Sequence, residues 1–252
     1  MTLTITGATT ELGRLLAQRT TRADIHVNLA GQQANTLLHD GHAWKDFARS
    51  ARAGLQRAMR TDAAVLVHAS CAFVLAEPAK DPLRSLAQTI VELEQQALSG
   101  PVPAVVVRLG YLYGPSSRDL RAYRTAFRLG RPYWAGRRRA GQFHLHHDDA
   151  VTALRAAAKK KHAGRTFYAT GGPALPFMAF MDAFARGVGR RVPLHVPLIA
   201  EPLMKLIVRK EHVQQAALAM PADLPTPTVP LWTPQWTDHV AALQSIIASW
   251  QD

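Results

Sequence analysis

The sequence has little cysteine and no long apolar run. Cys71 is the one cysteine, which excludes an intrachain disulfide and a zinc site built from several thiolates. No stretch approaches the about 18 consecutive apolar residues of a membrane-spanning helix, so no transmembrane segment is predicted. The first residues, MTLTITG, are typical of a strand rather than of a signal peptide. These absences favour a folded α/β protein in a reducing or redox-neutral compartment.

Acidic residues are also scarce. The chain has 18 Asp and Glu against 30 Lys and Arg, a net charge of +12. Such a balance favours an acidic partner, namely RNA, anionic lipid or another protein, or a basic setting such as the mitochondrial matrix. The charge lies in short loops, GRRRAG (136–141) and KKKH (159–162), without interleaved aromatic residues. A solvated loop or a protein contact is therefore favoured over an RNA or lipid site. An RNA role would rest on a basic face of Arg118, Arg121, Arg124, Arg128 and Arg137 to Arg139.

Apolar runs of strand type alternate with helical patterns in the first half of the chain. The predicted order is strand 2–6, helix 12–21, strand 25–29, helix 44–60, strand 64–70, helix 81–98 and strand 103–108. This alternation predicts a Rossmann-like parallel sheet covered by helices, an α/β fold.

The second half has a mixed pattern. We predict a basic helix or loop over 117–140, a helix near 148–160, a strand in RTFYATGG (165–172), a helix over 176–188, a proline-rich extended segment over 221–234 and a last helix over 237–250 capped by Thr237. We therefore predict a nucleotide-binding core over 1–115 and a small C-terminal α/β part over 116–252. The two parts are expected to interleave as one compact unit.

The loop TGATTELG, Thr6 to Gly13, follows a strand and opens a helix. This is the setting of a glycine-rich dinucleotide loop, in which backbone amides at the helix start face a pyrophosphate. Thr10 stands where a glycine is wanted, and Glu11 adds a negative charge. Cofactor contacts, weak or vestigial, are predicted for Gly7, Thr9, Thr10, Glu11, Leu12 and Gly13. A purely structural turn is the alternative.

Later segments carry a family resemblance. VRLGYLYGP (107–115) resembles the sixth-strand signature of extended short-chain dehydrogenases of the epimerase/dehydratase type. LHHDDAVTAL (145–154), RTFYATGG and the closing LWTPQWTDHVAALQSIIASW (231–250) resemble further segments of this family, in the family's order. The resemblance implies a Rossmann fold with a substrate-domain-like C-terminal part, and binding of NAD(H) or NADP(H).

The same resemblance exposes missing catalytic groups. It places Ser70 at the catalytic serine position, and Ser70 is also predicted to make a weak or vestigial cofactor contact together with the loop residues. The family also requires a tyrosine and, four residues later, a lysine on the next helix. That helix, PLRSLAQTIVELEQQ, has neither; its best alignment puts Arg84 and Gln88 there, and neither side chain can transfer the proton. No catalytic residue is therefore assigned beyond the retained Ser70.

The sheet is also predicted to be short. Residues 24–31, DIHVNLAG, resemble the fourth family strand more than the second, which implies the loss of two βα units. The second strand normally ends in the residue that recognises the adenine ribose. If 24–31 is the second strand instead, part of an adenosine pocket remains, and Asn28 and Gln32 are the residues that could bond the ribose.

Three other features have structural interpretations. His144, His146 and His147 crowd against Asp148 and Asp149, but the two acids are expected to cap a helix, and no metal site is predicted. Cys71 is expected to be a small buried hydrophobe. Tyr111 and Tyr113 are expected to be structural.

Together these features predict a catalytically degenerate protein of this fold that serves as an accessory subunit of a larger assembly. The resemblance suggests mitochondrial respiratory complex I, on its matrix side, as that assembly; a cytoplasmic location is the alternative. The cofactor is either none or a structural NADP(H) or NAD(H). The alternative functions are an atypical active NAD(P)-dependent oxidoreductase or epimerase and, less favoured, an RNA-associated protein.

Overall fold

Five parallel strands form the central sheet of the computed structural model, which describes residues 3–20, 25–30, 41–130, 141–192, 203 and 218–250. The strands lie in the order β1 (Leu3–Thr6), β2 (Ile25–Asn28), β3 (Val65–Cys71), β4 (Ala104–Leu109) and β8 (Thr166–Ala169). Buried Val, Ile, Leu and Ala dominate the inner strands, as expected for a parallel sheet covered on both faces. The predicted α/β Rossmann-like class is confirmed.

The position of β2 settles which family strand it represents. In the Rossmann order 3-2-1-4-5-6, the second strand lies outside the first, whereas the fourth lies inside it. Here β2 pairs with β1 on one side and with β3 on the other. It therefore occupies the fourth position, as residues 24–31 were predicted to do, and no strand of the described residues lies beyond β1.

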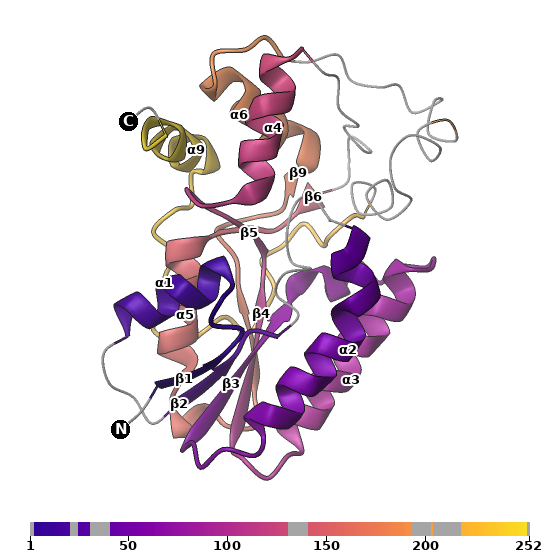
Figure 1. Ribbon diagram of the computed structural model, residues 1–252, viewed down its shortest axis with the longest axis vertical. Coiled ribbons are helices and arrows are strands. Elements are labelled where there is room, and N and C mark those ends of the chain that lie inside the picture. The colour runs from indigo at the N-terminus through magenta and orange to yellow at the C-terminus, as the bar shows by residue number, and fades with distance from the viewer. Residues whose placement is uncertain are drawn as a thin grey trace.

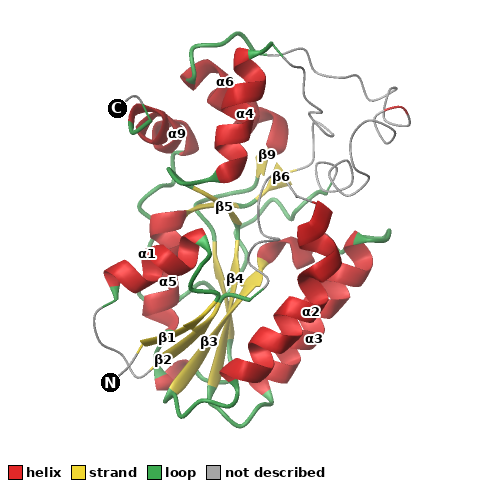
Figure 2. Ribbon diagram, viewed as in Figure 1, coloured by secondary structure: helices red, strands yellow, loops and turns green. Residues whose placement is uncertain are grey.

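Two pairs of helices cover the sheet (Figures 1 and 2). One face packs against α1 (Glu11–Arg19) and α5 (His147–Ala157), with Val27, Val67 and Val107 pointing toward these helices. The other face packs against α2 (Gly41–Ala58) and α3 (Leu83–Leu98). Because side chains alternate along a strand, His26, His68 and Arg108 fall on this second face.

The C-terminal part forms a second cluster at the carboxyl end of the sheet, at the top of Figure 1. It contains α4 (Arg118–Arg128), α6 (Phe177–Gly187) and α9 (His239–Ala248). Phe184 of α6 contacts Phe127 of α4 and Trp250, which follows α9. Short strands connect it to the core: β5 (Tyr111–Tyr113) pairs with β7 (His144–His146), and β6 (Gly141–Gln142) with β9 (Leu175–Pro176). Two 3-10 turns, η2 (Ala72–Ala76) and η3 (Lys160–His162), complete the described elements. None of the described helices is long and apolar enough to span a membrane.

The two edges of the sheet differ. The proline-rich segment lies along β8, where the Tyr168 amide donates to Pro227 O at 2.9 Å and the Val229 amide donates to Tyr168 O at 3.3 Å. This agrees with the extended crossing segment predicted over 221–234. On the opposite edge, β1 has β2 as its one sheet neighbour within the described ranges.

Two predicted helix starts were wrong by one or two residues. Helix α5 begins at His147, its N-cap is His146, and Asp148 and Asp149 lie in its first turn. The His146 side chain accepts the Asp148 amide, which frees the two acids for other contacts. Helix α9 is capped by Asp238, whose carboxylate accepts the amides of residues 240 and 241, and not by Thr237.

Candidate functional site

The loop from β1 to α1 is a tight turn that requires two glycines. Gly7 has a φ of 86°, in the left-handed region. A Cβ on Gly13 would lie 2.8 Å from the Cα of Ala8 and closer still to the carbonyl oxygen of Gly7. The turn therefore has the close strand–helix packing of a dinucleotide loop.

Thr10, which replaces the middle glycine, caps α1. Its hydroxyl accepts the Gly13 amide at 3.1 Å and donates to Gly7 O at 2.7 Å. The first amides of a helix have no partner inside the helix and normally serve an anion bound there. The Thr10 hydroxyl accepts one of these amides, that of Gly13, which is then not available to a bound anion. A glycine at this position could not make these two hydrogen bonds.

Glu11 opens α1 and turns toward the C-terminal part. Its Oε2 lies 3.8 Å from His147 Nε2, and its Oε1 is buried with no hydrogen-bond partner among the described residues. Burial raises the pKa of Glu11, and the Ser116 hydroxyl partly offsets this rise. A half-buried acid therefore stands at the helix end where a phosphate would bind.

The six predicted loop residues lie together at the carboxyl end of β1, but they differ in which of their groups can face a ligand. The Leu12 side chain is buried in the core against the sheet, so only its amide can face a ligand. The carbonyl of Thr9 accepts the Arg14 side chain at 3.1 Å. The backbone of the loop fits a pyrophosphate, whereas the side chains of Thr10 and Glu11 work against one.

Ser70 belongs to a different environment, between β3 and α3. It is 3% exposed, and its hydroxyl donates to Glu94 Oε1 in a short hydrogen bond. Arg108 holds the same carboxylate through Nε at 2.9 Å and Nη2 at 2.6 Å, and its Nη1 donates to the Tyr168 hydroxyl at 2.7 Å. Ser70 is thus part of a buried structural network and does not join the glycine loop residues.

Helix α3 offers no tyrosine or lysine near Ser70, and Glu94 is its one titratable side chain there. Arg84 and Gln88, aligned with the family's tyrosine and lysine, both lie on the exposed face, and Arg84 pairs with Asp81 at 2.7 Å. The buried face carries Leu86, Ile90 and Glu94 instead. Two positions four residues apart that face the sheet, Leu86 and Ile90, are aliphatic. The alignment of Arg84 and Gln88 with the family's catalytic positions stays a prediction.

The buried polar network extends across the sheet as a layer under α2 and α3. Thr6 Oγ1 lies 2.7 Å from His26 Nε2, and Asn28 Nδ2 donates to His68 Nδ1 at 3.0 Å. Burial lowers the pKa of His68 to about 4, so this ring stays neutral. Asn28 also accepts the Ala30 amide at 3.1 Å, so it is committed to the fold and does not face a ribose. Gln32 lies outside the described residues.

The histidine-rich segment is a packed aromatic cluster. His144 stacks on Phe180 with ring centroids 4.2 Å apart, and the Tyr113 hydroxyl lies 2.9 Å from His239 Nδ1. No group of His, Cys, Asp and Glu suited to a metal ion occurs in the described part of the chain. Cys71 is buried in the core, and Tyr111 and Tyr113 are buried too, in agreement with their predicted structural roles.

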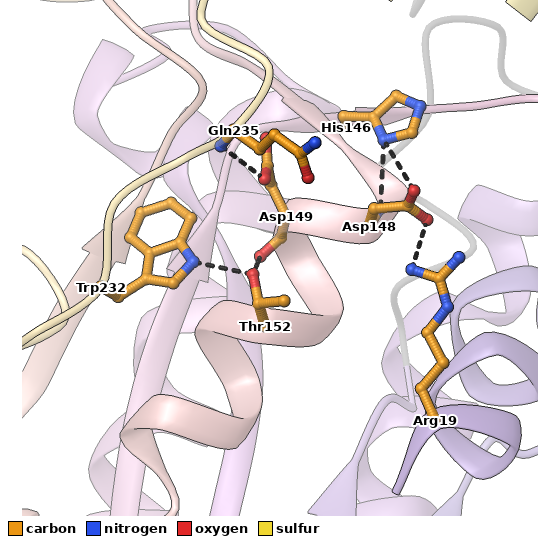
Figure 3. Close-up of polar contacts among 7 residues, drawn as sticks. All are labelled: Arg19, His146, Asp148, Asp149, Thr152, Trp232 and Gln235. Atoms are coloured by element: carbon orange, nitrogen blue, oxygen red, sulfur yellow. Dashed lines mark hydrogen bonds and ion pairs between the residues drawn. The ribbon is translucent and has the colours of Figure 1, made fainter.

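Asp149 fastens the C-terminal segment to α5 (Figure 3). Its carboxylate accepts the Gln235 amide at 2.8 Å and the Trp236 amide at 2.9 Å. One turn further along α5, Thr152 accepts the Trp232 indole N–H at 2.9 Å. The neighbouring Asp148 points the other way and pairs with Arg19 of α1 at 2.8 Å. The two acids therefore join three segments of the chain.

The basic regions are only partly described. Residues 136–140 lie outside the described ranges, and 160–162 form the turn η3. On α4, Arg121 and Arg124 stack over the Trp250 ring at 5.6 and 5.4 Å. Part of the predicted basic face is thus used to hold the C-terminal helix region in place.

Sequence reasoning missed Glu94 and did not foresee the contacts of Arg108 and His147. A signal existed for Glu94, because it stands four residues after Ile90 and three before Ala97 on the apolar stripe of the predicted helix. An acid on such a stripe requires a buried partner. The identity of that partner, Arg108, depends on the packing of α3 on β4, which no local pattern shows.

Comparison with solved structures places this fold among known ones. Human epimerase family protein SDR39U1 (isoform 2), solved with NADPH, superposes with a TM-score of 0.74 at 16% identity, covering 98% of this chain and 99% of that one. UDP-glucose 4-epimerase from Thermotoga maritima, solved with UDP-glucose, gives a TM-score of 0.70 at 12% identity, over 100% and 99%. The Bordetella bronchiseptica enzyme WbmG, solved with NAD, gives 0.67 at 14%, over 98% and 94%.

The sequence itself matches no protein-family model and no curated protein. At 12–16% identity, the superpositions show that the fold is shared and nothing further. The chain has the extended short-chain dehydrogenase fold of the NAD-dependent epimerases, as the sequence motifs predicted.

Proposed function

We propose that this chain is a catalytically silent protein with the fold of the NAD-dependent epimerases. In this proposal it serves as an accessory subunit of a larger assembly. The observation that carries the proposal is the state of α3 and Ser70. The buried face of α3 is aliphatic apart from Glu94, and Ser70 is bonded to that same carboxylate. A hydride transfer to a carbonyl needs a proton donor in reach of the substrate oxygen, and this face supplies none.

The Glu94 carboxylate is a poor substitute for the missing acid. It accepts three hydrogen bonds from Arg108 and one from Ser70. These hydrogen bonds engage both carboxylate oxygens within the fold, between β3, β4 and α3.

A bound dinucleotide would serve a structural purpose in this proposal. Gly7, Gly13 and the first amides of α1 would hold its pyrophosphate, and the nicotinamide would supply hydride chemistry only if a proton donor were added. Support comes from the neighbouring folds solved with NADPH or NAD. In the complete fold, an acid or base at the end of the second strand binds the adenine ribose. Here β2 occupies the fourth strand position and no described strand lies beyond β1, so that residue has no counterpart among the described strands. Weak or absent binding is therefore expected.

Turnover is the direct test. Full-length chain is incubated with NADH or NADPH and a panel of aldehydes and ketones, and with UDP-glucose, while nicotinamide absorbance and sugar products are followed. We expect no turnover above a Ser70→Ala variant. A rate that Ser70→Ala abolishes would overturn the proposal in favour of an atypical oxidoreductase or epimerase.

Within the described residues no strand lies beyond β1, and this edge supports a role in assembly. An uncovered edge offers backbone donors and acceptors to a strand of another chain, and natural edges are commonly protected by charge or proline. β1 is uncharged, with an exposed Thr4 at its centre. Thr4→Lys should weaken association while the melting temperature stays unchanged, and Thr89→Lys on exposed α3 is the matched control. If the two variants associate equally well with the partner, the β1 edge is not part of the contact surface.

Respiratory complex I is the specific assembly that we propose, with the chain on the matrix side. Support comes from the tyrosine-free α3 and from the glycine-glycine-proline turn, Gly171 to Pro173, after β8. The test is co-migration of the tagged chain with complex I in native gels of mitochondrial membranes. Migration apart from complex I would exclude complex I as the assembly, while the proposed accessory role would still stand.

A further inference from the structure

The Glu11 carboxyl lies where three segments meet: the start of α1, the turn 114–117 and the start of α5. Its Oε2 is 3.8 Å from His147 Nε2, and Ser116 of the turn has a lowering effect on the pKa of the carboxyl. Arg14, Arg118 and Asp119 supply the remaining nearby charges. Its other oxygen is buried without a hydrogen-bond partner in the described part of the chain.

His147 does not neutralise this carboxylate. Its side chain is 3% exposed, and burial lowers its pKa to about 3, so the ring is uncharged near neutral pH. Its Nδ1 is buried and has no partner within the described ranges. Gly114 leaves the room for this ring, because a Cβ there would clash with it. Glu11 therefore faces an uncharged ring with one unused nitrogen.

The same end of α1 is the anion site of the fold. Amides of the first turn point there, and the helix dipole favours negative charge. A diphosphate and an ionised Glu11 compete for this single positive end of the helix. Two like charges about 6 Å apart, at an effective dielectric constant near 20, repel by enough to change affinity more than ten-fold.

We infer that Glu11 is an acid gate for the glycine loop: the loop takes up the diphosphate of a dinucleotide together with a proton on the Glu11 carboxyl. The inference rests on the proposed function only in treating this loop as the nucleotide site. A protonated Glu11 removes the repulsion and can donate a hydrogen bond to the phosphate or to His147.

The sign of the pH dependence follows. Burial and Asp119 raise the pKa of Glu11, against the lowering effects of Ser116, Arg14 and Arg118. Above that pKa the carboxylate is charged and repels the diphosphate, so affinity falls as pH rises, by at most about ten-fold per pH unit for one proton. Below it, affinity levels off. Without an ionisable group at position 11 the dependence disappears.

Calorimetric titration of the full chain with NAD⁺, at about pH 6 and about pH 8, tests the inference; the NAD⁺ diphosphate stays fully ionised over this range. Glu11→Gln should bind at least about ten-fold more tightly than the unaltered chain at the higher pH, and equally at both values. Glu92→Gln, which removes an exposed acid from α3, should behave like the unaltered chain. Circular dichroism at each pH confirms folding.

Repeating the titration in two buffers of different ionisation enthalpy counts protons directly. The unaltered chain should take up a proton, at most one per NAD⁺, between the Glu11 pKa of the free chain and that of the complex, and Glu11→Gln should take up none. Equal or weaker binding by Glu11→Gln, or no binding by either chain at any pH, overturns the inference. Turnover is measured separately, so a silent chain that binds NAD⁺ through the gate supports both proposals, and an active chain overturns only the first.

Discussion

Glu94 is the single residue on which most of the buried polar layer depends. Its side chain is 4% exposed and holds both Ser70 and the Arg108 guanidinium. Replacing it by alanine leaves the Arg108 charge buried without an anion. We expect Glu94→Ala to lower the free energy of unfolding by about 3–5 kcal/mol, measured by urea denaturation.

Glu92, two residues earlier on the same helix, provides the matched control. It is exposed and lies 3.5 Å from Arg52 on α2. Surface pairs of this kind contribute about 0–1 kcal/mol, so Glu92→Ala should be close to neutral. Similar losses for the two variants would mean that the Arg108 pair does not stabilise the fold.

Gly13 is required by packing and not by nucleotide. Any Cβ at this position meets the backbone of Gly7 and Ala8, which cannot move without opening the turn. Gly13→Val should destabilise the chain by about 1–3 kcal/mol whether or not NAD⁺ is present. Gly187→Ala, which would meet only the flexible end of Ile247, should have little effect. A stable Gly13→Val chain that loses only nucleotide would contradict this assignment.

Among the elements, α5 is the one that joins the two parts of the chain. Asp149 binds the amides of residues 235 and 236 just before α9 begins (Figure 3). Asp149→Ala removes two charge-assisted hydrogen bonds, each worth about 1.5–3 kcal/mol. We expect faster hydrogen exchange over 228–238, followed by mass spectrometry, with unchanged exchange in β3. Asp148→Ala, which removes an exposed pair with Arg19, should leave the exchange of 228–238 as it was.

Local pattern predicted most elements and missed the contacts between them. Helix α3 was predicted over 81–98 and is observed at Leu83–Leu98, because its apolar stripe and its ends are encoded locally. The start of α5 was misplaced because His146, rather than an aspartate, provides the capping acceptor. Ser70 was correctly placed in a strand, but its bond to Glu94 spans 24 residues and depends on how α3 packs on β3. The candidate catalytic role of Ser70 could only be judged once that contact was visible.

At the scale of the whole molecule, buried histidines make the fold sensitive to acid. Burial lowers the pKa of six of them: His26, His68, His144, His146, His147 and His239. In the unfolded chain these rings titrate near 6.5, so below that pH the unfolded state binds more protons than the folded one. Stability is therefore complete above about pH 6.5 and is lost as pH falls toward the folded pKa of His68, about 4.

Urea midpoints measured at about pH 7 and about pH 5 test this. Each neutral buried histidine contributes up to about 1.4 kcal/mol per pH unit, so the midpoint should fall clearly at the lower pH. A His68→Gln variant should show a shallower loss. Identical midpoints at both values would mean that these rings are protonated in the fold.

The overall architecture was predictable because strand and helix patterns alternate strongly in the first 109 residues. The loss of two βα units was visible as missing length, and the assignment of residues 24–31 to the fourth strand position was confirmed by strand order. The division into two parts at residue 115 stays a prediction, since β8 and residues 227–229 return to the sheet. Strand pairing between distant segments is a non-local property, so the capped β8 edge was not foreseen.

The two unlike edges of the sheet limit how far it can extend. Pro227 and Pro230 lack the N–H that a further strand would need, so growth past β8 is blocked on that side. Within the described residues, only β1 can accept a neighbour. Two copies that met edge to edge at β1 would both present their blocked sides outward. Pairing through this sheet therefore terminates after one step and cannot propagate into a fibre.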